Sequence, residues 1–371
     1  MNAIDTALPA DLGEGGHGVA EAGSRALPLL SVKDLKVHFK IGRKRPGGEQ
    51  DKVHAVDGVS FDIQRGRTMA IVGESGSGKT TTALSIMRLA PVTAGTIRFN
   101  DVDLTAMEGE ALRQQRRHFQ LVFQDPYSSL NPRQRAGDIV RMPLMLMGMG
   151  TPAQQREKVT EMFRLVGLRE DQQMLFPHQF SGGQRQRLNI ARALATDPQL
   201  VVCDEPVSAL DIAIRAQILN LLRRIQRERG QSFLFISHDM AVVEHICDDI
   251  AVMYLGQIVE QGSRVGFFSR PLHPYSVALM SAVPTVSGGR EKAASRIRLS
   301  GDPPSPINPP KGCRFAGRCP AAQPLCEQEP PALREVIPGH KVACHFVRAD
   351  GNRITAPLDG HRAYGNVEHF A

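Results

Sequence analysis

The amino-acid sequence has 371 residues, of which 42% are hydrophobic and 22% charged, an ordinary globular composition with room for two or three domains. No apolar run approaches the ~18 residues of a membrane-spanning helix, so we expect any membrane role to depend on a partner chain. A formal net charge of +7 permits contact with nucleic acid or an anionic surface, but a basic protein without such a partner fits it equally well.

The N-terminal residues 1–28 are rich in Gly and Ala and include several acidic residues. They lack the basic start and apolar centre of a secretion signal, so we expect a flexible tail and a cytoplasmic protein. Without such a signal, six cysteines favour metal binding or reduced thiols over a disulfide framework. Two of them, Cys203 and Cys247, stand in apolar or helical surroundings and are expected to be packing residues.

Two stretches at 30–39 and 55–63 alternate apolar and polar residues and predict half-buried antiparallel strands. The basic, turn-rich segment 42–48 joins them, and we expect it to be solvated rather than a binding patch. Residues 95–99 indicate another strand, and residues 133–179 carry helical patterns rich in methionine. We interpret these methionines as core or as an adaptable apolar contact surface.

A glycine loop follows the apolar run 68–72 and precedes a helical pattern, the context that a phosphate-binding motif requires. The spacing G-x-x-x-x-G-K-T is met by Gly73, Gly78, Lys79 and Thr80. Glycine lets backbone N–H groups approach a triphosphate, Lys79 can reach the β- and γ-phosphates, and the Thr80 hydroxyl can ligate Mg²⁺. The residues expected to bind the nucleotide are Gly73, Glu74, Ser75, Gly76, Ser77, Gly78, Lys79, Thr80 and Thr81.

A second phosphate-binding surface is predicted at the start of another helix. Ser181 is a suitable N-cap, and Gly182 and Gly183 beside it leave backbone N–H groups bare at a positive helix end. Upstream, the strand pattern 119–126 delivers Gln124 at its end.

Two further strands are predicted to end in catalytic groups. The run 200–206, apolar and ended by two carboxylates, has the pattern of a strand buried on both faces, and ligands lie at the carboxyl end of such strands. Asp204 would hold Mg²⁺, and Glu205 would act as base on the attacking water. His238 follows the strand pattern 232–236 and is interpreted as a γ-phosphate contact, although a lone histidine is more often structural.

These motifs, in this order, make the chain resemble the nucleotide-binding subunit of an ABC transporter from about residue 29 to 262. The motifs are the glycine loop, Gln124, the sequence 181–184, Asp204-Glu205, Ser208-Ala209-Leu210-Asp211 and His238. The resemblance implies an α/β P-loop NTPase fold with a RecA-like core, an antiparallel β-subdomain and an inserted α-helical subdomain at about 133–190.

The resemblance also implies catalytic roles. Glu205 is expected to be the base and His238 the switch histidine of an active ATPase whose cofactors are ATP and Mg²⁺. Gln124 is expected to touch Mg²⁺, beside the groove that takes the coupling helix of a membrane subunit. Phe39 lies where the family often has an aromatic residue that stacks on adenine, although a long insert follows it.

Other motifs resemble parts of a dimer interface. In the family, the signature sequence binds ATP that the opposite subunit holds, and it corresponds here to Ser181, Gly182, Gly183 and Gln184. Asp211 corresponds to the aspartate that crosses the interface. The signature begins with Phe180, where many members have Leu, which changes an apolar neighbour and not the phosphate contacts.

The C-terminal part resembles the tail of oligopeptide and dipeptide importers through His273-Pro274-Tyr275 and the Pro-rich stretch 301–306. Four cysteines fall here, Cys313, Cys319, Cys326 and Cys344, with five, six and seventeen residues between them. Zinc sites usually have tighter pairs, whereas this spacing is compatible with an iron–sulfur cluster, and the resemblance implies a [4Fe–4S] cluster. Four unligated thiols are the alternative, and a cluster would leave open whether it braces the segment or transfers electrons.

We therefore expect a flexible tail at 1–28, a nucleotide-binding domain at 29–270, a small Cys/Pro-rich domain at 271–346 and a second tail at 347–371. The resemblance implies a head-to-tail dimer with a copy of the chain or a paralogue. It also implies two transmembrane permease subunits and, indirectly, an extracytoplasmic solute-binding protein. The chain would lie at the cytoplasmic face of the inner membrane, and no nucleic acid is expected as partner.

Two alternatives remain at this point. The same subfamily also imports nickel, glutathione and other small solutes, and the cargo is selected by proteins that this chain only drives. A soluble ABC ATPase acting on nucleic acid or the ribosome is the other alternative. Against it, the sequence has one phosphate loop and no long coiled coil or zinc hook inside the domain.

Overall fold

The computed structural model describes residues 27–42, 50–283, 297, 299, 301–348 and 350–351. Most of the two predicted tails, 1–28 and 347–371, and of the basic segment 42–48 lies outside these residues. Within the described ranges, no helix is both long enough and apolar enough to cross a membrane.

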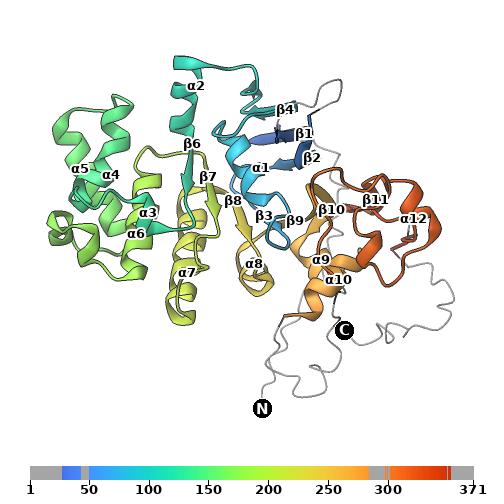
Figure 1. The fold of residues 1–371 in the computed structure, drawn as a ribbon. Coiled ribbons are helices and arrows are strands. Elements are labelled where there is room, and N and C mark those ends of the chain that lie inside the picture. The colour runs from blue at the N-terminus through green and yellow to red at the C-terminus, as the bar shows by residue number, and fades with distance from the viewer. Residues whose placement is uncertain are drawn as a thin grey trace, which may run out of the picture.

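The centre of the molecule is a mixed sheet, eight-stranded in the described part of the chain, with the order β11-β12-β10-β9-β3-β8-β7-β6 (Figure 1). Its strands are β3 Thr68–Val72, β6 Phe119–Val122, β7 Leu200–Asp204, β8 Ser232–Ser237, β9 Asp249–Tyr254, β10 Gln257–Ser263, β11 Arg334–Ile337 and β12 His340–Val342. From β9 to β6 the strands are parallel, and β10, β12 and β11 continue the sheet in antiparallel pairs. Strands β3, β7 and β8 are buried along their whole length, as their unbroken apolar runs predict.

A second sheet is antiparallel, and its described strands have the order β2-β1-β4-β5. Its strands are β1 Leu30–Lys40, β2 Lys52–Ile63, β4 Ala94–Phe99 and β5 Val102–Asp103. In β2, Val59, Phe61 and Ile63 are buried while Ser60 and Asp62 between them are exposed. This alternation confirms the predicted half-buried antiparallel strands.

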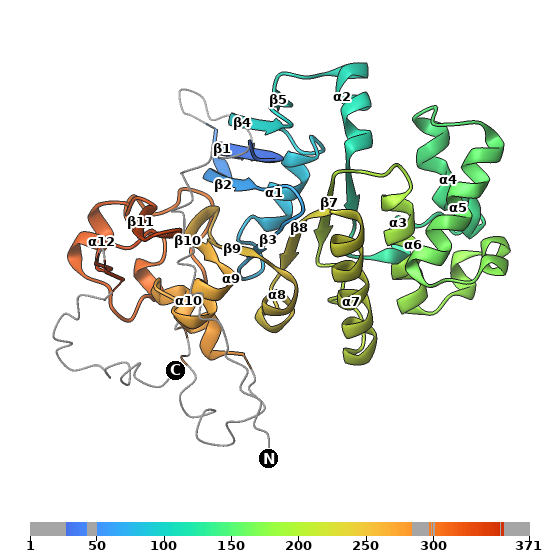
Figure 2. The same cartoon turned by 180° about the vertical axis from the view of Figure 1, so that it is seen from behind.

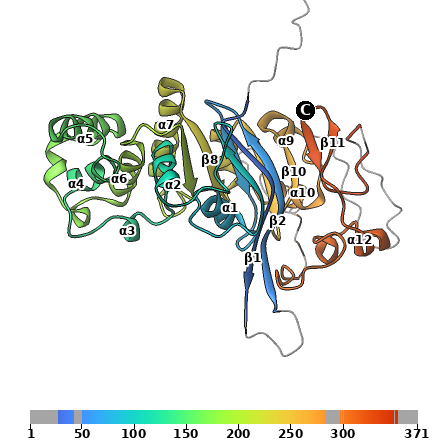
Figure 3. The same cartoon turned by 90° about the horizontal axis from the view of Figure 1, so that it is seen from above.

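Helix α1 (Lys79–Ile86) lies between the two sheets (Figure 3). Its Ala83 and Ile86 belong to one apolar cluster with residues of β1, β2, β7 and β8. This burial fixes the helix, and with it the glycine loop between β3 and α1. The chain between these strands also forms α2 Gly109–Gln115, η1 Arg116–His118, α7 Ile212–Arg229 and α8 Met240–Ile246.

A helical lobe forms one end of the molecule (Figures 1 and 2). It contains α3 Pro126–Ser129, α4 Ala136–Leu146, α5 Pro152–Val166, η2 Glu170–Met174, η3 Pro177–Gln179 and α6 Gly182–Leu194. A capping box at Thr151 starts α5, and Gly167 ends it in the left-handed conformation at φ 73°. Met162 is buried in the core of the lobe, whereas Met145 is 49% exposed, and its role in a contact surface stays a prediction.

The C-terminal segment packs on the opposite end of the larger sheet (Figure 1) and contains α9 Arg264–Ser269, α10 Pro274–Ser281, η4 Ala316–Arg318 and α12 Pro324–Gln328. It extends the sheet, since β12 pairs with β10 through Glu260 and Val342. The fully buried Glu260 carboxylate accepts hydrogen bonds from the backbone N–H groups of Leu272 and His273 and lies 2.8 Å from His340 Nε2. The segment is thus joined to the sheet by strand pairing and by a buried polar network, which the sequence did not reveal.

Candidate active site

The glycine loop occupies a space in which larger residues do not fit. Gly73 and Gly78 have φ values of 155° and 105°. A Cβ atom at Gly73 would lie 2.1 Å from the backbone oxygen of Met253, and one at Gly78 would lie 2.2 Å from that of Ala55. Both the conformation and the surrounding backbone therefore require glycine here.

Lys79 is held inside this loop. Its Nζ donates to the backbone oxygens of Gly73 and Glu74, at 2.8 Å each. Burial lowers the pKa of Lys79, and the carboxylates of Glu205, Asp204 and Glu74 oppose that shift. The ammonium group is thus positioned where the phosphates of a nucleotide would lie.

Thr80 and Asp204 place oxygen atoms side by side at the carboxyl end of β7. Thr80 Oγ1 donates to Asp204 Oδ1 at 3.2 Å, across the first turn of α1 and the end of β7. Burial raises the pKa of Asp204, while the hydrogen bond from Thr80 opposes the shift and the adjacent Glu205 adds to it. A hydroxyl and a carboxylate are hard oxygen ligands, so these residues fit the predicted Mg²⁺.

Glu205 is bound from two sides. Gln124 Nε2 donates to Oε2 at 3.0 Å, and His238 Nδ1 lies 3.0 Å from Oε1. The Glu205 side chain is 16% exposed, and its backbone is in the left-handed region at φ 44°. A hydrogen bond from its N–H to Ile236 O, at 3.0 Å, ties this unusual conformation to β8. The structure therefore brings together the three predicted strand ends.

The signature residues form the start of α6. Ser181 Oγ accepts from the N–H of Gln184 at 3.3 Å, and Gln184 Oε1 accepts from the N–H of Ser181 at 2.9 Å, a capping box. A Cβ atom at Gly183 would lie 2.5 Å from Ile214 Cγ2, which explains the glycine there. Phe180 is buried. Helix α6 belongs to the helical lobe, well separated from α1 in every view, so the chain does not bring its own signature to its own glycine loop (Figures 1 and 2).

Two predicted residues lie away from these contacts. Phe39 is 37% exposed near the end of β1, and Asp211 is exposed at the N-cap of α7. Their assignments to adenine stacking and to the dimer interface stay predictions.

The cysteines fall into two groups. Cys203 and Cys247 are buried, in agreement with packing roles. In the C-terminal segment, the Cys313 N–H donates to Cys326 O at 2.6 Å. Burial, together with nearby Cys326 and Cys344, raises the pKa of Cys313 to about 11. Among the described residues, no three cysteine sulfurs lie within 4.8 Å of one another, so the iron–sulfur cluster stays a prediction.

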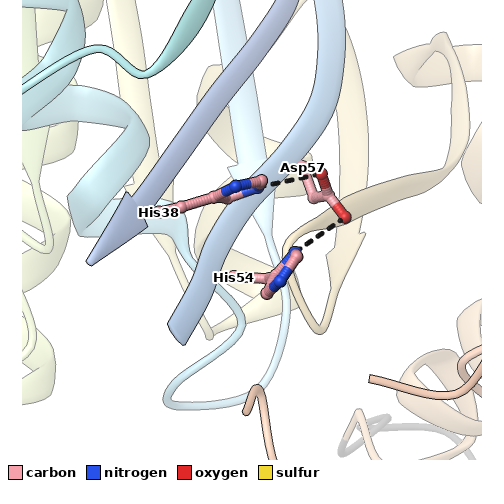
Figure 4. Close-up of side chains that lie close together, drawn as sticks. All are labelled: His38, His54 and Asp57. Atoms are coloured by element: carbon pink, nitrogen blue, oxygen red, sulfur yellow. Dashed lines mark hydrogen bonds and ion pairs between the residues drawn. The ribbon is translucent and has the colours of Figure 1, made fainter. Parts of the chain in front are cut away.

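A cluster of His38, His54 and Asp57 lies on the strands β1 and β2 (Figure 4). His38 Nε2 is 3.0 Å from Asp57 Oδ1, and His54 Nδ1 is 3.4 Å from Oδ2. Arg314, from the C-terminal segment, also binds Asp57 and donates to Leu255 O at 2.5 Å. Because a guanidinium already neutralises the carboxylate, we interpret the cluster as a hydrogen-bond network between the β-subdomain and the C-terminal segment, not as a metal site.

Sequence reasoning missed the contacts that the C-terminal segment makes with the glycine loop. Tyr275 Oη accepts from the N–H of Glu74 at 2.8 Å, and Arg318 donates to both carboxylate oxygens of Glu74. Tyr275 lies in the motif that suggested the subfamily, but no local pattern predicts a partner more than 200 residues away.

Comparison with known proteins places these features in a family. The family model "ABC transporter" matches residues 56–208, and "Oligopeptide/dipeptide transporter, C-terminal region" matches residues 259–326. The chain is 46% identical over 325 residues to the putative oligopeptide transport ATP-binding protein YkfD of Bacillus subtilis, covering 87% of this chain and 97% of YkfD. It is 45% identical over 325 residues to the dipeptide transport ATP-binding protein DppF of Escherichia coli, covering 88% and 96%.

Solved structures agree. The dimeric ATP-binding cassette MJ0796, in a post-hydrolysis state bound to ADP and Pi, is similar with a TM-score of 0.57 and 28% identity, covering 63% of this chain and 98% of that one. CbiO1 of Clostridium perfringens, part of the ABC transporter complex cbiONQ, gives a TM-score of 0.59 and 25% identity, covering 73% and 99%. These likenesses confirm the predicted α/β P-loop fold. The chain therefore belongs to the ABC transporter family, among its oligopeptide and dipeptide transport ATP-binding proteins.

Proposed function

We propose that this chain is the ATP-hydrolysing subunit of an importer of oligopeptides or dipeptides, and that it drives separate membrane subunits. The observation that carries the proposal is Glu205 held between Gln124 and His238, because it provides an oriented base beside residues that fit a triphosphate. The match of residues 259–326 to the C-terminal region of oligopeptide and dipeptide transporters favours peptide as the cargo.

In this mechanism, the N–H groups of the glycine loop and the Lys79 ammonium bind the phosphates of ATP. Thr80, Asp204 and Gln124 would hold Mg²⁺, which would offset the charge on the phosphate oxygens of ATP. Glu205 accepts a proton from the water that attacks the γ-phosphorus, while the bond from that phosphorus to the β,γ-bridging oxygen breaks and ADP leaves. His238 keeps the carboxylate aimed at that water and contacts the γ-phosphate.

We infer that two such subunits close head to tail around two ATP molecules. The signature residues 181–184 cap a helix remote from the loop of their own chain, which supports a role on ATP held by a partner. ATP favours the closed dimer only to the extent that it binds the closed form more tightly than the open one. Hydrolysis then removes the γ-phosphate that bridges the two subunits. The partner is a copy of this chain or a paralogue.

We also propose that the helical lobe receives the transmembrane permease subunits. Phe123 and Tyr127, beside Gln124, are 41% and 64% exposed, and Arg185 stacks on the Tyr127 ring at 4.0 Å. Nearby in the sequence, a groove of about 390 Å³ is lined by Arg133, Gln134, Arg135, Asp138, Arg141, Met142, Met145 and Phe176. Exposed aromatic and methionine side chains beside a groove suit an inserted helix. The chain would thus sit peripherally on the cytoplasmic face of the inner membrane.

The four C-terminal cysteines are proposed to hold a [4Fe–4S] cluster. Support comes from the match of residues 259–326 to the C-terminal region of oligopeptide and dipeptide transporters, and from the Cys313 N–H, which donates to Cys326 O at 2.6 Å. Burial, with nearby Cys344, Cys313 and Cys326, raises the pKa of the Cys319 thiol to about 12. Thiolate is the ligand form, and iron binding would offset the unfavourable charge on these sulfurs.

Uptake by native cells tests the proposed cargo. A chromosomal Glu205→Gln allele should abolish uptake of labelled di- and oligopeptides and leave uptake of Ni²⁺ and glutathione unchanged, with Glu157→Gln, at an exposed carboxylate of α5, as the matched control. Loss of nickel or glutathione uptake with intact peptide uptake would contradict the proposed cargo. If the allele leaves the uptake of peptides, Ni²⁺ and glutathione unchanged and growth on peptides is normal, an ATPase with a role outside transport would be favoured.

A further inference from the structure

Glu74, the second residue of the glycine loop, is held by two side chains of the C-terminal segment. The Tyr275 hydroxyl accepts a hydrogen bond from the backbone N–H of Glu74 at 2.8 Å. Arg318 Nη1 and Nη2 donate to the two carboxylate oxygens of Glu74 at 2.8 and 3.3 Å. Both contacts reach the loop from outside the strand and the helix that flank it.

The two side chains are themselves fixed. Tyr275 is fully buried, with its ring 4.7 Å from that of Tyr254 and 5.4 Å from that of Phe315. The Arg318 side chain is 9% exposed and also donates to the Tyr254 hydroxyl at 3.4 Å. The Glu74 side chain is 30% exposed, so water reaches this pair in part, but charge-assisted, bidentate hydrogen bonds are still the stronger kind.

The protonation states suit this arrangement at neutral pH. Burial raises the pKa of Tyr275, so its hydroxyl stays neutral. The hydrogen bond to Glu74 raises the pKa of Arg318, so the guanidinium stays charged.

The backbone carbonyl of Glu74 also has partners. Glu74 O accepts from Lys79 Nζ at 2.8 Å, and the N–H of Ser77 donates to it at 3.2 Å. The N–H, the carbonyl and the carboxylate of Glu74 therefore all have partners. A loop that binds phosphates with backbone N–H groups gains affinity when its path is set before the ligand arrives.

We propose that Tyr275 and Arg318 are positioning residues of the ATP site, which hold the glycine loop in its phosphate-binding conformation through Glu74. The C-terminal segment, whose sequence resembles that of a subfamily-specific appendage, thereby contributes to nucleotide affinity. This inference rests on the ATP site of the proposed function and adds two residues to it.

The experiment measures the Kd of MgATP and the steady-state kinetics of the intact purified transporter with Tyr275→Phe and Arg318→Gln. Each change should raise Kd and KM about threefold to tenfold, the effect of losing one or two net hydrogen bonds. The value of kcat at saturating ATP should stay within about twofold, because Glu205 and His238 stand on other loops. Arg318→Lys, which keeps the charge and one hydrogen bond, should give an intermediate Kd.

A double-mutant cycle distinguishes a positioning role in the ATP site from a merely structural role. If Arg318 acts through the Glu74 carboxylate, the effects of Arg318→Gln and Glu74→Gln on Kd should be far from additive. The matched control is Arg67→Gln. Arg67 makes an equivalent bidentate contact with Asp249, at 3.0 and 3.2 Å, at the other end of β3, and its loss should leave the Kd of ATP unchanged.

Wild-type Kd values in Tyr275→Phe and Arg318→Gln would overturn the inference, as would an equal rise in Kd for Arg67→Gln or fully additive effects in the cycle. The proposed function fails by a different result, the absence of ATP binding and hydrolysis in the wild-type complex. The two failures are therefore distinguishable.

Discussion

His238 Nδ1 lies 3.0 Å from Glu205 Oε1 and joins two loops that leave neighbouring strands of the sheet. An ionised carboxylate can only accept, so the imidazole donates its Nδ1–H in this pair. Gln124 donates to the other oxygen at 3.0 Å. The carboxylate is thus oriented by two donors from different strand ends, and it keeps further lone pairs for a water molecule.

Replacing His238 by Ala should lower kcat about 10²-fold, the usual contribution of one group to an acid–base step, with a smaller rise in the KM for ATP from the lost γ-phosphate contact. Glu205 would keep the hydrogen bond from Gln124 but lose the one from His238, which fixes its second carboxylate oxygen. Phosphate release from the purified complex measures the change. An unchanged kcat would remove His238 from the catalytic set.

Mixing two inactive variants tests the shared site. Lys79→Ala damages the glycine loop and Ser181→Arg damages the signature, so each homodimer should be inactive. A mixed dimer combines one damaged site with one intact site, because the intact loop and signature then meet. If the chain pairs with itself, about a quarter of wild-type ATPase activity should return, assuming statistical mixing and independent sites. No recovery between folded, self-associating variants would contradict head-to-tail pairing.

The glycine loop, Asp204, Glu205 and the helix caps could all be predicted because their signals are local. Each of these features is encoded within a few residues. The loop needs glycine at two fixed positions, the buried strand is a short apolar run, and the helix cap is a single serine. Gly73 shows why the mark is strict, since any side chain there would meet the Met253 carbonyl oxygen. The structure adds that Gln124 and His238 both meet Glu205, because the carboxyl ends of parallel strands lie at one edge of the sheet.

The network around Asp57 should make stability depend on pH. Burial favours the neutral form, but Arg314 and His38 together hold the pKa of Asp57 below its usual value of 3.8. A depressed folded-state pKa stabilises the protein above the unfolded pKa, and this contribution disappears as the pH falls through the folded value. Asp57→Asn should therefore lower the free energy of unfolding by about 2 kcal/mol at pH 7, and this loss should shrink as the pH falls below 3.8.

Urea unfolding at the two pH values measures this effect. Asp171→Asn is the control, because Asp171 has an arginine partner too but is exposed to solvent, so its loss should matter little at either pH. Equal effects of Asp57→Asn at pH 7 and pH 3 would show that the ion pair with Arg314 is not the source.

Anaerobic purification tests the proposed cluster. The chain should contain about four iron and four sulfide per protein, with a broad visible absorption that oxygen bleaches, and Cys326→Ser should lose most of it. Stoichiometric zinc without iron would contradict the cluster and favour a zinc site instead. Absence of any metal would leave four buried or half-buried thiols as the correct description.

The contacts of the C-terminal segment could not be predicted, because they join residues far apart in the chain. Arg318 and Glu74 are separated by 244 positions, and Arg314 and Asp57 by 257. A single arginine in a loop carries no local sign of its partner. The pairing of β12 with β10 was hidden for the same reason, since β12 has only three residues and no strong alternation.

The most direct measurement of the central claim compares ATP turnover and ATP retention by the Glu205→Gln complex with those of the wild type. If Glu205 is the base, phosphate release should fall at least ~10²-fold, because the amide cannot accept the proton of water. The glycine loop, Thr80 and Asp204 are intact in this variant, so ATP should stay bound and hold the subunits as a closed dimer. Hydrolysis by Glu205→Gln at the wild-type rate would contradict the account.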